Sequence, residues 1–216
     1  MTERDRILCG GWLAILKEMP GGCVQCVVTS PPYWGLRDYK VGGQVGLEKT
    51  PAEYVAKLVE GFRELRRVLR DDGTLWLNMG DSYATQGGGG RQGATGQRAD
   101  RTFTAEGTSA RGVPFGLKPK DLCGMPWRVA FALQADGWHL RCDIIWSKPN
   151  PMPESVRDRP TKAHEYLFLL TKKARYFYDQ EAAREDAIHA GREVRYDGTQ
   201  KNCRAGDDVN EGRIQA

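Results

Sequence analysis

The chain has 216 residues, a length that suits one domain of about 100 to 200 residues and is short for two. Hydrophobic residues make up 40% of it and charged residues 28%, which argues against a chain disordered throughout, a collagen-like repeat or a coiled coil. Lysine and arginine number 32 against 28 acidic residues, and the charge of +4 permits nucleic acid as a partner without requiring it. No apolar stretch approaches about 18 residues, so the sequence predicts no membrane span, no signal peptide and a cytoplasmic location.

The N-terminal segment alternates between strand-like and helical patterns. We expect a short strand at residues 7–9, a helix at 12–19 and a buried strand at 23–29. Two prolines follow this strand, so the chain must leave the sheet as a loop, and such loops carry the functional sites of open α/β sheets. Cys23 and Cys26 have the spacing of half a zinc site, but the other four cysteines are scattered, and packing within the strand is the stronger interpretation.

The best-defined helix begins at a capping box. Thr50 and Glu53 provide the box, Pro51 takes the first helical position, and apolar residues follow at helical spacing. An Asp-Asp-Gly turn at 71–73 then leads into a strand at 74–79. The order β, α, β, α, β predicts a mostly parallel sheet with helices packed on it.

A long segment of glycine and polar residues interrupts the second half of the chain. Residues 84–116 have almost no large apolar side chains, so we expect a flexible insertion whose arginines either meet a polyanion or have no role. The ordered elements expected after it are a helix at 120–135, a strand at 138–146, a proline-braced loop at 148–153, and two strands at 166–171 and 175–178 that pair as an antiparallel hairpin. Residues 181–216 are charged and lack a hydrophobic period, which indicates a poorly ordered tail after a core of residues 1–180.

Four sequence blocks occur in an order that resembles one enzyme family. They are Ser30-Pro-Pro-Tyr-Trp-Gly-Leu-Arg-Asp-Tyr39, Gly73-Thr-Leu-Trp-Leu-Asn-Met-Gly-Asp-Ser-Tyr83, Asp143-Ile-Ile-Trp-Ser-Lys-Pro-Asn-Pro-Met-Pro153 and His164-Glu-Tyr-Leu-Phe168. Together they are similar to the DNA methyltransferases that methylate N4 of cytosine or N6 of adenine from S-adenosylmethionine. The resemblance implies a Rossmann-like class I methyltransferase sheet, mostly parallel with an antiparallel hairpin. It also implies double-stranded DNA with a flipped target base as the partner.

The family's catalytic motif corresponds to Ser30, Pro31, Pro32 and Tyr33. An exocyclic amine is a poor nucleophile because its lone pair is delocalised into the ring, and hydrogen-bond acceptors aimed at the NH₂ localise that pair. The Ser30 hydroxyl and the Pro31 carbonyl are the expected acceptors, and the two prolines fix their positions. Tyr33 offers a face on which the flipped base stacks. Ser30 in the first position resembles the cytosine-N4 subgroup more than the adenine subgroup, where Asp or Asn is usual.

Further candidate residues could contact DNA or the target base. They are Trp34, Asp38, Asp81, Lys148, Asn150, Arg157 and Arg159. Several have a structural alternative, since Asp38 could pair with Arg37, Asp81 could cap a turn, and the two arginines could lie on a solvated surface. Trp146, close to Lys148 in sequence, is interpreted as a core residue.

The methyl-donor site is where the sequence departs from the family pattern. In this permuted subgroup a Phe-x-Gly-x-Gly loop comes late in the chain, and these 216 residues contain none. The glycines at 87–90 do not replace it, because no strand precedes them. Gly10 and Gly11 remain as cofactor-binding candidates, although the family has Asp where this chain has Gly11. We therefore expect a C-terminally incomplete enzyme with weak or no affinity for S-adenosylmethionine.

Two other functions fit the same residues. A methyltransferase for RNA or for a protein amide also uses an Asn-Pro-Pro-Tyr type of loop on this fold, although Ser30 favours DNA. A DNA-binding remnant without catalytic activity would account for the missing cofactor motif. For the enzyme interpretation, the resemblance implies a restriction–modification setting in a prokaryotic or phage-infected cytoplasm.

Overall fold

The computed structural model describes residues 5–84 and 116–184. The chain divides into two compact units, Met1–Phe177 and Tyr178–Ala216, and every helix and strand below belongs to the first. The predicted flexible insertion and poorly ordered tail fall almost entirely on residues 85–115 and 185–216, which lie outside the described residues. None of the described helices is long and apolar enough to cross a membrane.

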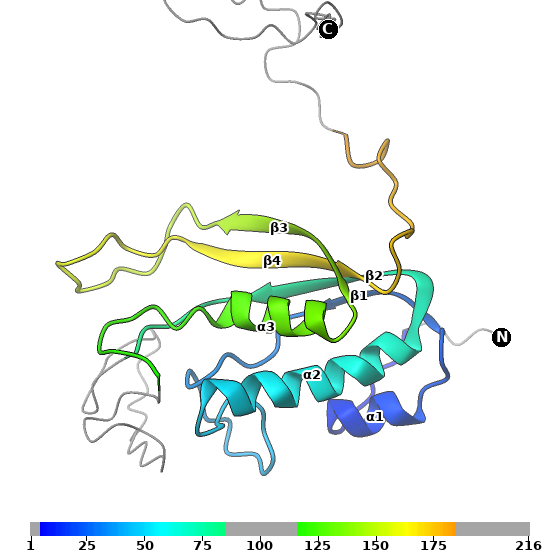
Figure 1. Ribbon diagram of the computed structural model, residues 1–216, viewed down its shortest axis with the longest axis horizontal. Helices are drawn as coiled ribbons and strands as arrows, with labels where there is room; N and C mark the ends of the chain where they lie inside the picture. The colour runs from blue at the N-terminus through cyan, green and yellow to red at the C-terminus, as the bar shows by residue number, and fades with distance from the viewer. Residues whose placement is uncertain (1–4, 85–115, 185–216) are drawn as a thin grey trace, which may run out of the picture. The chain divides into compact units, whose positions relative to one another are not determined.

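Four strands form one open sheet in the order β1-β2-β4-β3. Their bounds are Val24–Thr29 for β1, Leu69–Met79 for β2, His139–Ser147 for β3 and His164–Thr171 for β4. Strand β1 is parallel to β2, while β4 is antiparallel to both β2 and β3, so three of the four strands run in one direction (Figure 1). The predicted α/β sheet with antiparallel pairing is confirmed.

The antiparallel hairpin has different members from those predicted. Strand β4 pairs with β3 across the loop of residues 148–163, and residues 176–178 form no strand. The prediction that 175–178 pairs with 166–171 is wrong because both edges of β4 are already occupied, one by β2 and one by β3. The backbone N–H of Phe177 instead donates to the carbonyl of Asp72 at 2.9 Å.

Helices α2 and α3 lie on the same face of the sheet, and α1 packs against α2 (Figure 1). Their bounds are Trp12–Glu18 for α1, Pro51–Val68 for α2 and Met125–Ala135 for α3. The predicted capping box is confirmed, because Thr50 Oγ1 accepts from the N–H of Glu53 and Glu53 Oε2 accepts from the N–H of Thr50, both at 3.2 Å. This box fixes where α2 begins, directly after the loop that carries the Ser30 motif.

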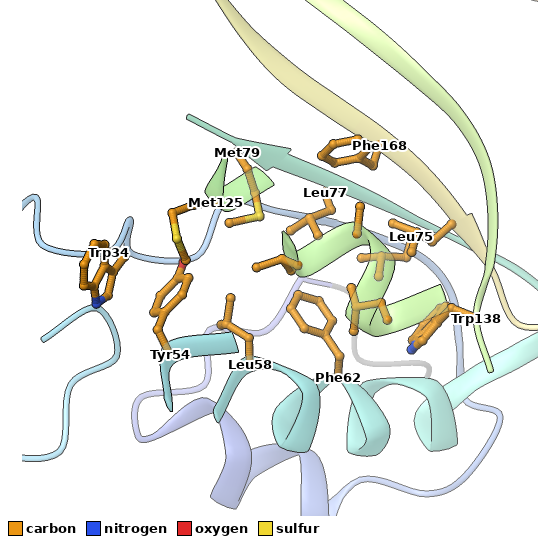
Figure 2. Packing of buried hydrophobic residues seen from close by; sticks show 14 of the residues in the cluster. Trp34, Tyr54, Leu58, Phe62, Leu75, Leu77, Met79, Met125, Trp138 and Phe168 are labelled. Atoms are coloured by element: carbon orange, nitrogen blue, oxygen red, sulfur yellow. The ribbon is translucent and has the colours of Figure 1, made fainter. Parts of the chain in front are cut away.

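The core lies between α2, α3 and one face of β2. Leu75, Leu77 and Met79 alternate along β2 and are at most 1% exposed. Figure 2 shows them facing Leu58 and Phe62 of α2. Because side chains alternate across a strand, the intervening residues of β2 point to the opposite face, and they include a polar residue, Asn78.

Several predicted boundaries differ from the structure. Residues 7–9 form no strand, and Ile7 is 99% exposed, because no described strand lies beside them to pair. Helix α3 begins at Met125 rather than at residue 120, since Gly124 takes a left-handed φ of 67° that interrupts a helix on its N-terminal side. Strand β2 begins at Leu69, and the predicted turn at 71–73 is an irregularity in its pairing with β1. The outer face of β1 is not buried, because Val28 is 75% exposed.

Replacing Gly61 by alanine tests how closely α1 packs on α2. A Cβ at Gly61 would lie 1.9 Å from Cη2 of Trp12, so Gly61→Ala must displace the indole from its edge contact with Phe62. Alanine normally stabilises a helix interior by about 1 kcal/mol over glycine, but here we expect a loss of about 1–3 kcal/mol from overpacking. Urea denaturation measures this change in the free energy of unfolding. Glu60→Ala, at the exposed neighbouring position, should change stability by no more than about 0.5 kcal/mol. A more stable Gly61→Ala variant would contradict the close approach.

Candidate functional site

The Ser30 motif leaves the sheet beside the end of β2. Thr29, the last residue of β1, pairs with Leu77, so the chain turns away at the level of Asn78. On the other side of β2, Asn78 pairs with Leu167 of β4, and Glu165 lies two residues from Leu167 on the same face. The register of three strands thus places one serine, one amide and one carboxylate together.

A hydrogen-bonded cluster joins these side chains, and we call Ser30, Tyr33, Asn78, Glu165 and Lys148 the Asn78 network. Asn78 Oδ1 accepts from Ser30 Oγ at 3.2 Å and lies 3.0 Å from Tyr33 Oη. Asn78 Nδ2 donates to Glu165 Oε2 at 3.3 Å, and Tyr33 Oη lies 3.1 Å from that same carboxylate oxygen. Lys148 Nζ forms an ion pair with the other oxygen, Glu165 Oε1.

The surroundings of Glu165 keep its carboxylate ionised. Burial alone would raise the pKa of Glu165, but the hydrogen bond and charge of Lys148, with hydrogen bonds from Asn78 and Tyr33, outweigh it and lower that pKa. For Tyr33, burial and the nearby negative charge of Glu165 raise the pKa of the phenol, so the hydroxyl keeps its proton. The network therefore holds a negative Glu165 and a neutral Tyr33.

Two buried aromatic residues hold the rest of the motif loop against the core. Tyr54 of α2 is fully buried, and its hydroxyl donates to the carbonyl of Pro32 at 3.0 Å. Trp34 is 8% exposed and donates from Nε1 to the carbonyl of Glu48 at 2.9 Å. No hydrogen bond among the described residues reaches the Pro31 carbonyl, which leaves this predicted acceptor available.

Trp34 does not fit the predicted role of a base or DNA contact. Its side chain is part of the hydrophobic core at the end nearest the motif, as Figure 2 shows beside Tyr54 and Met125. A buried indole whose N–H is already bonded cannot be offered to a partner. The aromatic residue that is exposed nearby is Trp146, which was predicted to be in the core but is 55% exposed, with Lys148 Nζ 5.5 Å from its ring centroid.

Asp81 caps the start of α3. Its Oδ1 accepts from the N–H groups of Ser82 at 2.9 Å and Met125 at 3.0 Å, and its Oδ2 accepts from Gly124 at 3.0 Å. Three backbone donors occupy the carboxylate, so the capping alternative describes the geometry of this residue. Asp38 likewise bonds locally, accepting from the N–H of Lys40 at 2.7 Å in an exposed turn.

The remaining candidates come from the loop between β3 and β4 and differ in exposure and in their partners. Arg159 is not free for DNA, because its guanidinium pairs with Glu154 at 2.6 Å and lies 3.8 Å from the centroid of the Tyr83 ring. Arg157 and Asn150 are exposed in the loop between β3 and β4. Lys148 begins that loop and belongs to the Asn78 network.

Gly10 and Gly11 lie directly before α1, and no hydrogen bond among the described residues joins them to the Asn78 network. Gly11 precedes α1, and a Cβ built on it would meet no atom within 4 Å. A Cβ on Gly10, which precedes α1, would touch only Ile15 of that helix.

Asn78 and Glu165 were not singled out from the sequence. Both lie inside blocks that carried the family resemblance, but as ordinary members of strands. The signal that could have identified them is a polar side chain within an apolar strand, since such a group needs a partner when the sheet forms. Asn78 follows Leu-Trp-Leu, and Glu165 precedes Tyr-Leu-Phe-Leu-Leu.

Comparison with known proteins identifies the family. The profile of the DNA methylase family of N6 and N4 methyltransferases matches residues 24–210. Over 184 residues the chain is 55% identical to the Type II methyltransferase M.XycI of Xanthomonas campestris pv. cyanopsidis and 54% identical to the Type II methyltransferase M.Cfr9I of Citrobacter freundii. The chain belongs to this DNA methylase family.

These matches differ in how much of each protein they cover. The aligned region is 84% of this chain but 59% of each of the two relatives. Among solved structures, the PvuII DNA methyltransferase, described as cytosine-N4-specific, superimposes with a TM-score of 0.53 at 18% identity, covering 79% of this chain and 50% of the other. The likeness confirms the predicted methyltransferase fold.

The lowered pKa of Glu165 predicts a pH dependence of stability. Its ionised form stabilises the fold above the ordinary carboxyl pKa of roughly 4.3, and this contribution is lost as the pH falls through the lower pKa of the folded state. Urea unfolding at a series of pH values should therefore show a smaller acid loss of stability for Glu165→Gln than for the natural chain. Glu60→Gln, an exposed control, should keep the natural slope. Equal slopes for all three would contradict the role of the network.

Gly80→Ala should displace Tyr33 from the network. A Cβ at Gly80 would lie 2.6 Å from Cε2 of Tyr33, whose hydroxyl is held by Asn78 and Glu165. We expect a loss of stability of about 1–3 kcal/mol and a shift of the Tyr33 ring resonances in NMR spectra. Gly42→Ala, where a Cβ meets nothing within 4 Å, is the control. Unchanged Tyr33 resonances in Gly80→Ala would show that the ring does not lie against Gly80.

Proposed function

We propose that the described unit is the base-binding and amine-activating part of a DNA amino-methyltransferase that acts on cytosine N4 in preference to adenine N6. The donor in this proposal is S-adenosylmethionine, the substrate is duplex DNA with the target base flipped out, and the setting is the cytoplasm. The observation that carries it is the exposed Ser30 hydroxyl at the end of β1, backed by Asn78 and followed by two prolines.

The geometry suits an amine substrate. In the transition state the exocyclic nitrogen becomes more positive, so acceptors already in place bind it more strongly than they bind the ground state. Ser30 Oγ and the Pro31 carbonyl are adjacent acceptors in a loop that Tyr54 and Trp34 fasten to the core. Preorganisation, rather than acid–base chemistry, is the contribution of this loop.

Two observations support cytosine over adenine. The first residue of the motif is Ser30, and the superimposed PvuII enzyme is described as cytosine-N4-specific.

Residues of the loop between β3 and β4 are available for DNA contact. Asn150 and Arg157 are exposed there, and Trp146 presents an exposed ring beside Lys148. An amide and a guanidinium can contact phosphate or a base edge, and an exposed indole can stack on an unpaired base.

The methyl donor is assigned to this protein by its family. The Phe-x-Gly-x-Gly loop that the family resemblance implies is not among the described residues. We therefore derive no step of the reaction through the donor and propose that most of its site is formed by residues other than those described. Calorimetric titration of the chain with S-adenosylmethionine should show no binding in the micromolar range, and micromolar affinity would contradict this part of the proposal.

Methyl transfer tests the amine-activating role directly. The full chain, with labelled S-adenosylmethionine at high concentration, is offered duplex DNA, RNA and a protein mixture, and the labelled products are separated as nucleosides and amino acids. We expect N4-methylcytosine in DNA. Ser30→Ala should reduce the rate by about 10²-fold, the effect of removing one preorganised hydrogen-bonding group from a transition state. Ser155→Ala, in the exposed loop, should leave the rate unchanged.

The other outcomes separate the alternatives. N6-methyladenine would overturn the preference for cytosine, and label in RNA or protein would overturn the substrate class. DNA binding without methyl transfer would favour the non-catalytic remnant. Full activity of Ser30→Ala would remove Ser30 from the mechanism.

A further inference from the structure

The Asn78 network restricts where the Ser30 hydroxyl can place its one proton. Two acceptors lie within reach of Ser30 Oγ, Asn78 Oδ1 at 3.2 Å and Tyr33 Oη at 3.4 Å, and both belong to the network. A hydroxyl that donates to either one directs its lone pairs away from it. Since Ser30 is exposed, those lone pairs are open to a bound base.

The orientation of the Asn78 amide follows from its neighbours. Its nitrogen lies 3.3 Å from Glu165 Oε2 and 3.3 Å from the carbonyl of Tyr166, two groups that can only accept hydrogen bonds. Both hydrogens of the Nδ2 group are thus used, and a reversed amide would place an oxygen against two oxygens. Asn78 Oδ1 must therefore face Ser30 and Tyr33.

Glu165 also determines the direction of the Tyr33 proton. Tyr33 Oη lies within hydrogen-bond distance of Asn78 Oδ1 and of the ionised Glu165 carboxylate. Hydrogen bonds to an ionised acceptor are the stronger ones, so Tyr33 donates to Glu165 and leaves Asn78 Oδ1 for Ser30. Lys148 from the loop after β3 balances the charge of Glu165, and Lys162 adds positive charge nearby. With Ser30 donating to Asn78 Oδ1 and Tyr33 to Glu165, the Ser30, Tyr33 and Asn78 donors all have acceptors.

We propose that Asn78 and Glu165 are positioning residues that fix the Ser30 hydroxyl as a hydrogen-bond acceptor toward the target base. This rests on the proposed function in one respect, that the group facing Ser30 is an exocyclic amine. A fixed acceptor favours the NH₂ of cytosine or adenine. Thymine and guanine have a carbonyl oxygen at the corresponding position, and two acceptors facing each other repel. The network would thus contribute to specificity as well as to rate, since a freely rotating hydroxyl could donate to those carbonyls.

NMR spectroscopy of the ¹⁵N-labelled full chain tests the network without requiring activity. The Asn78 side-chain NH₂ signals, assigned by their loss in Asn78→Asp, should shift with pH at a midpoint below that of an ordinary glutamate. In Glu165→Gln this pH-dependent shift should disappear. In Lys148→Met its midpoint should move to higher pH. Lys120→Met, which removes an exposed ion pair with Asp158, is the control and should keep the natural midpoint. Ser30→Ala should shift the same signals and Ser155→Ala should not. If the chemical shifts of the Asn78 NH₂ group are unchanged by both Glu165→Gln and Ser30→Ala, the inference is overturned.

Kinetics distinguishes positioning from a merely structural role. If Asn78 acts through Ser30, Asn78→Leu should lower kcat by about 10-fold with little change in KM for DNA, and should have almost no further effect in a Ser30→Ala background. Additive losses in the double variant would overturn the inference. A natural chain that transfers no methyl group to any base would contradict the proposed function of this chain, while the NMR signals would still decide whether the network fixes Ser30.

Discussion

The side-chain amide of Asn78 connects the three chain segments that meet at the candidate site. It bonds to Ser30 after β1, and it bonds to Glu165 and to the backbone of Tyr166 on β4, while Asn78 itself belongs to β2. A half-buried amide of this kind costs free energy unless all its hydrogen-bonding groups are satisfied, so it accepts only one arrangement of its neighbours. The motif loop, the sheet register and the charge of Glu165 are thereby tied together.

The two faces of β2 have different roles, one in the core and one in the candidate site. One face is apolar, and Leu75, Leu77 and Met79 pack on the helices. The opposite face carries Asn78, and Ser30 after β1 and Glu165 of β4 lie beside it because β1, β2 and β4 are adjacent. The helices contribute to the site indirectly, since Tyr54 of α2 holds the Pro32 carbonyl and the Asp81 cap holds the start of α3 beside the end of β2.

The elements that could be predicted from the sequence are those whose signals are local. The capping box of α2 and the proline exit of β1 depend on residues close together in the chain, and both are present. The strand proposed at 7–9, the partner of β4 and the core position of Trp146 depended on distant neighbours, and these predictions were wrong. Local hydrophobicity cannot say which strand occupies an edge. For the site, Ser30 and Tyr33 are marked by the motif, whereas Asn78 and Glu165 acquire meaning only when β2 and β4 pair.

We propose that this cluster holds Ser30 as an acceptor for an amine, in a protein of the DNA methylase family. Neutron diffraction from deuterated crystals of the chain tests it most directly, because it locates the deuterium atoms on Ser30, Tyr33 and Asn78. We expect deuterium on Ser30 Oγ directed at Asn78 Oδ1 and both deuterium atoms of Nδ2 directed at Glu165 and the Tyr166 carbonyl. A Ser30 deuterium pointing to solvent, or an Asn78 amide turned with its nitrogen toward Ser30, would contradict it.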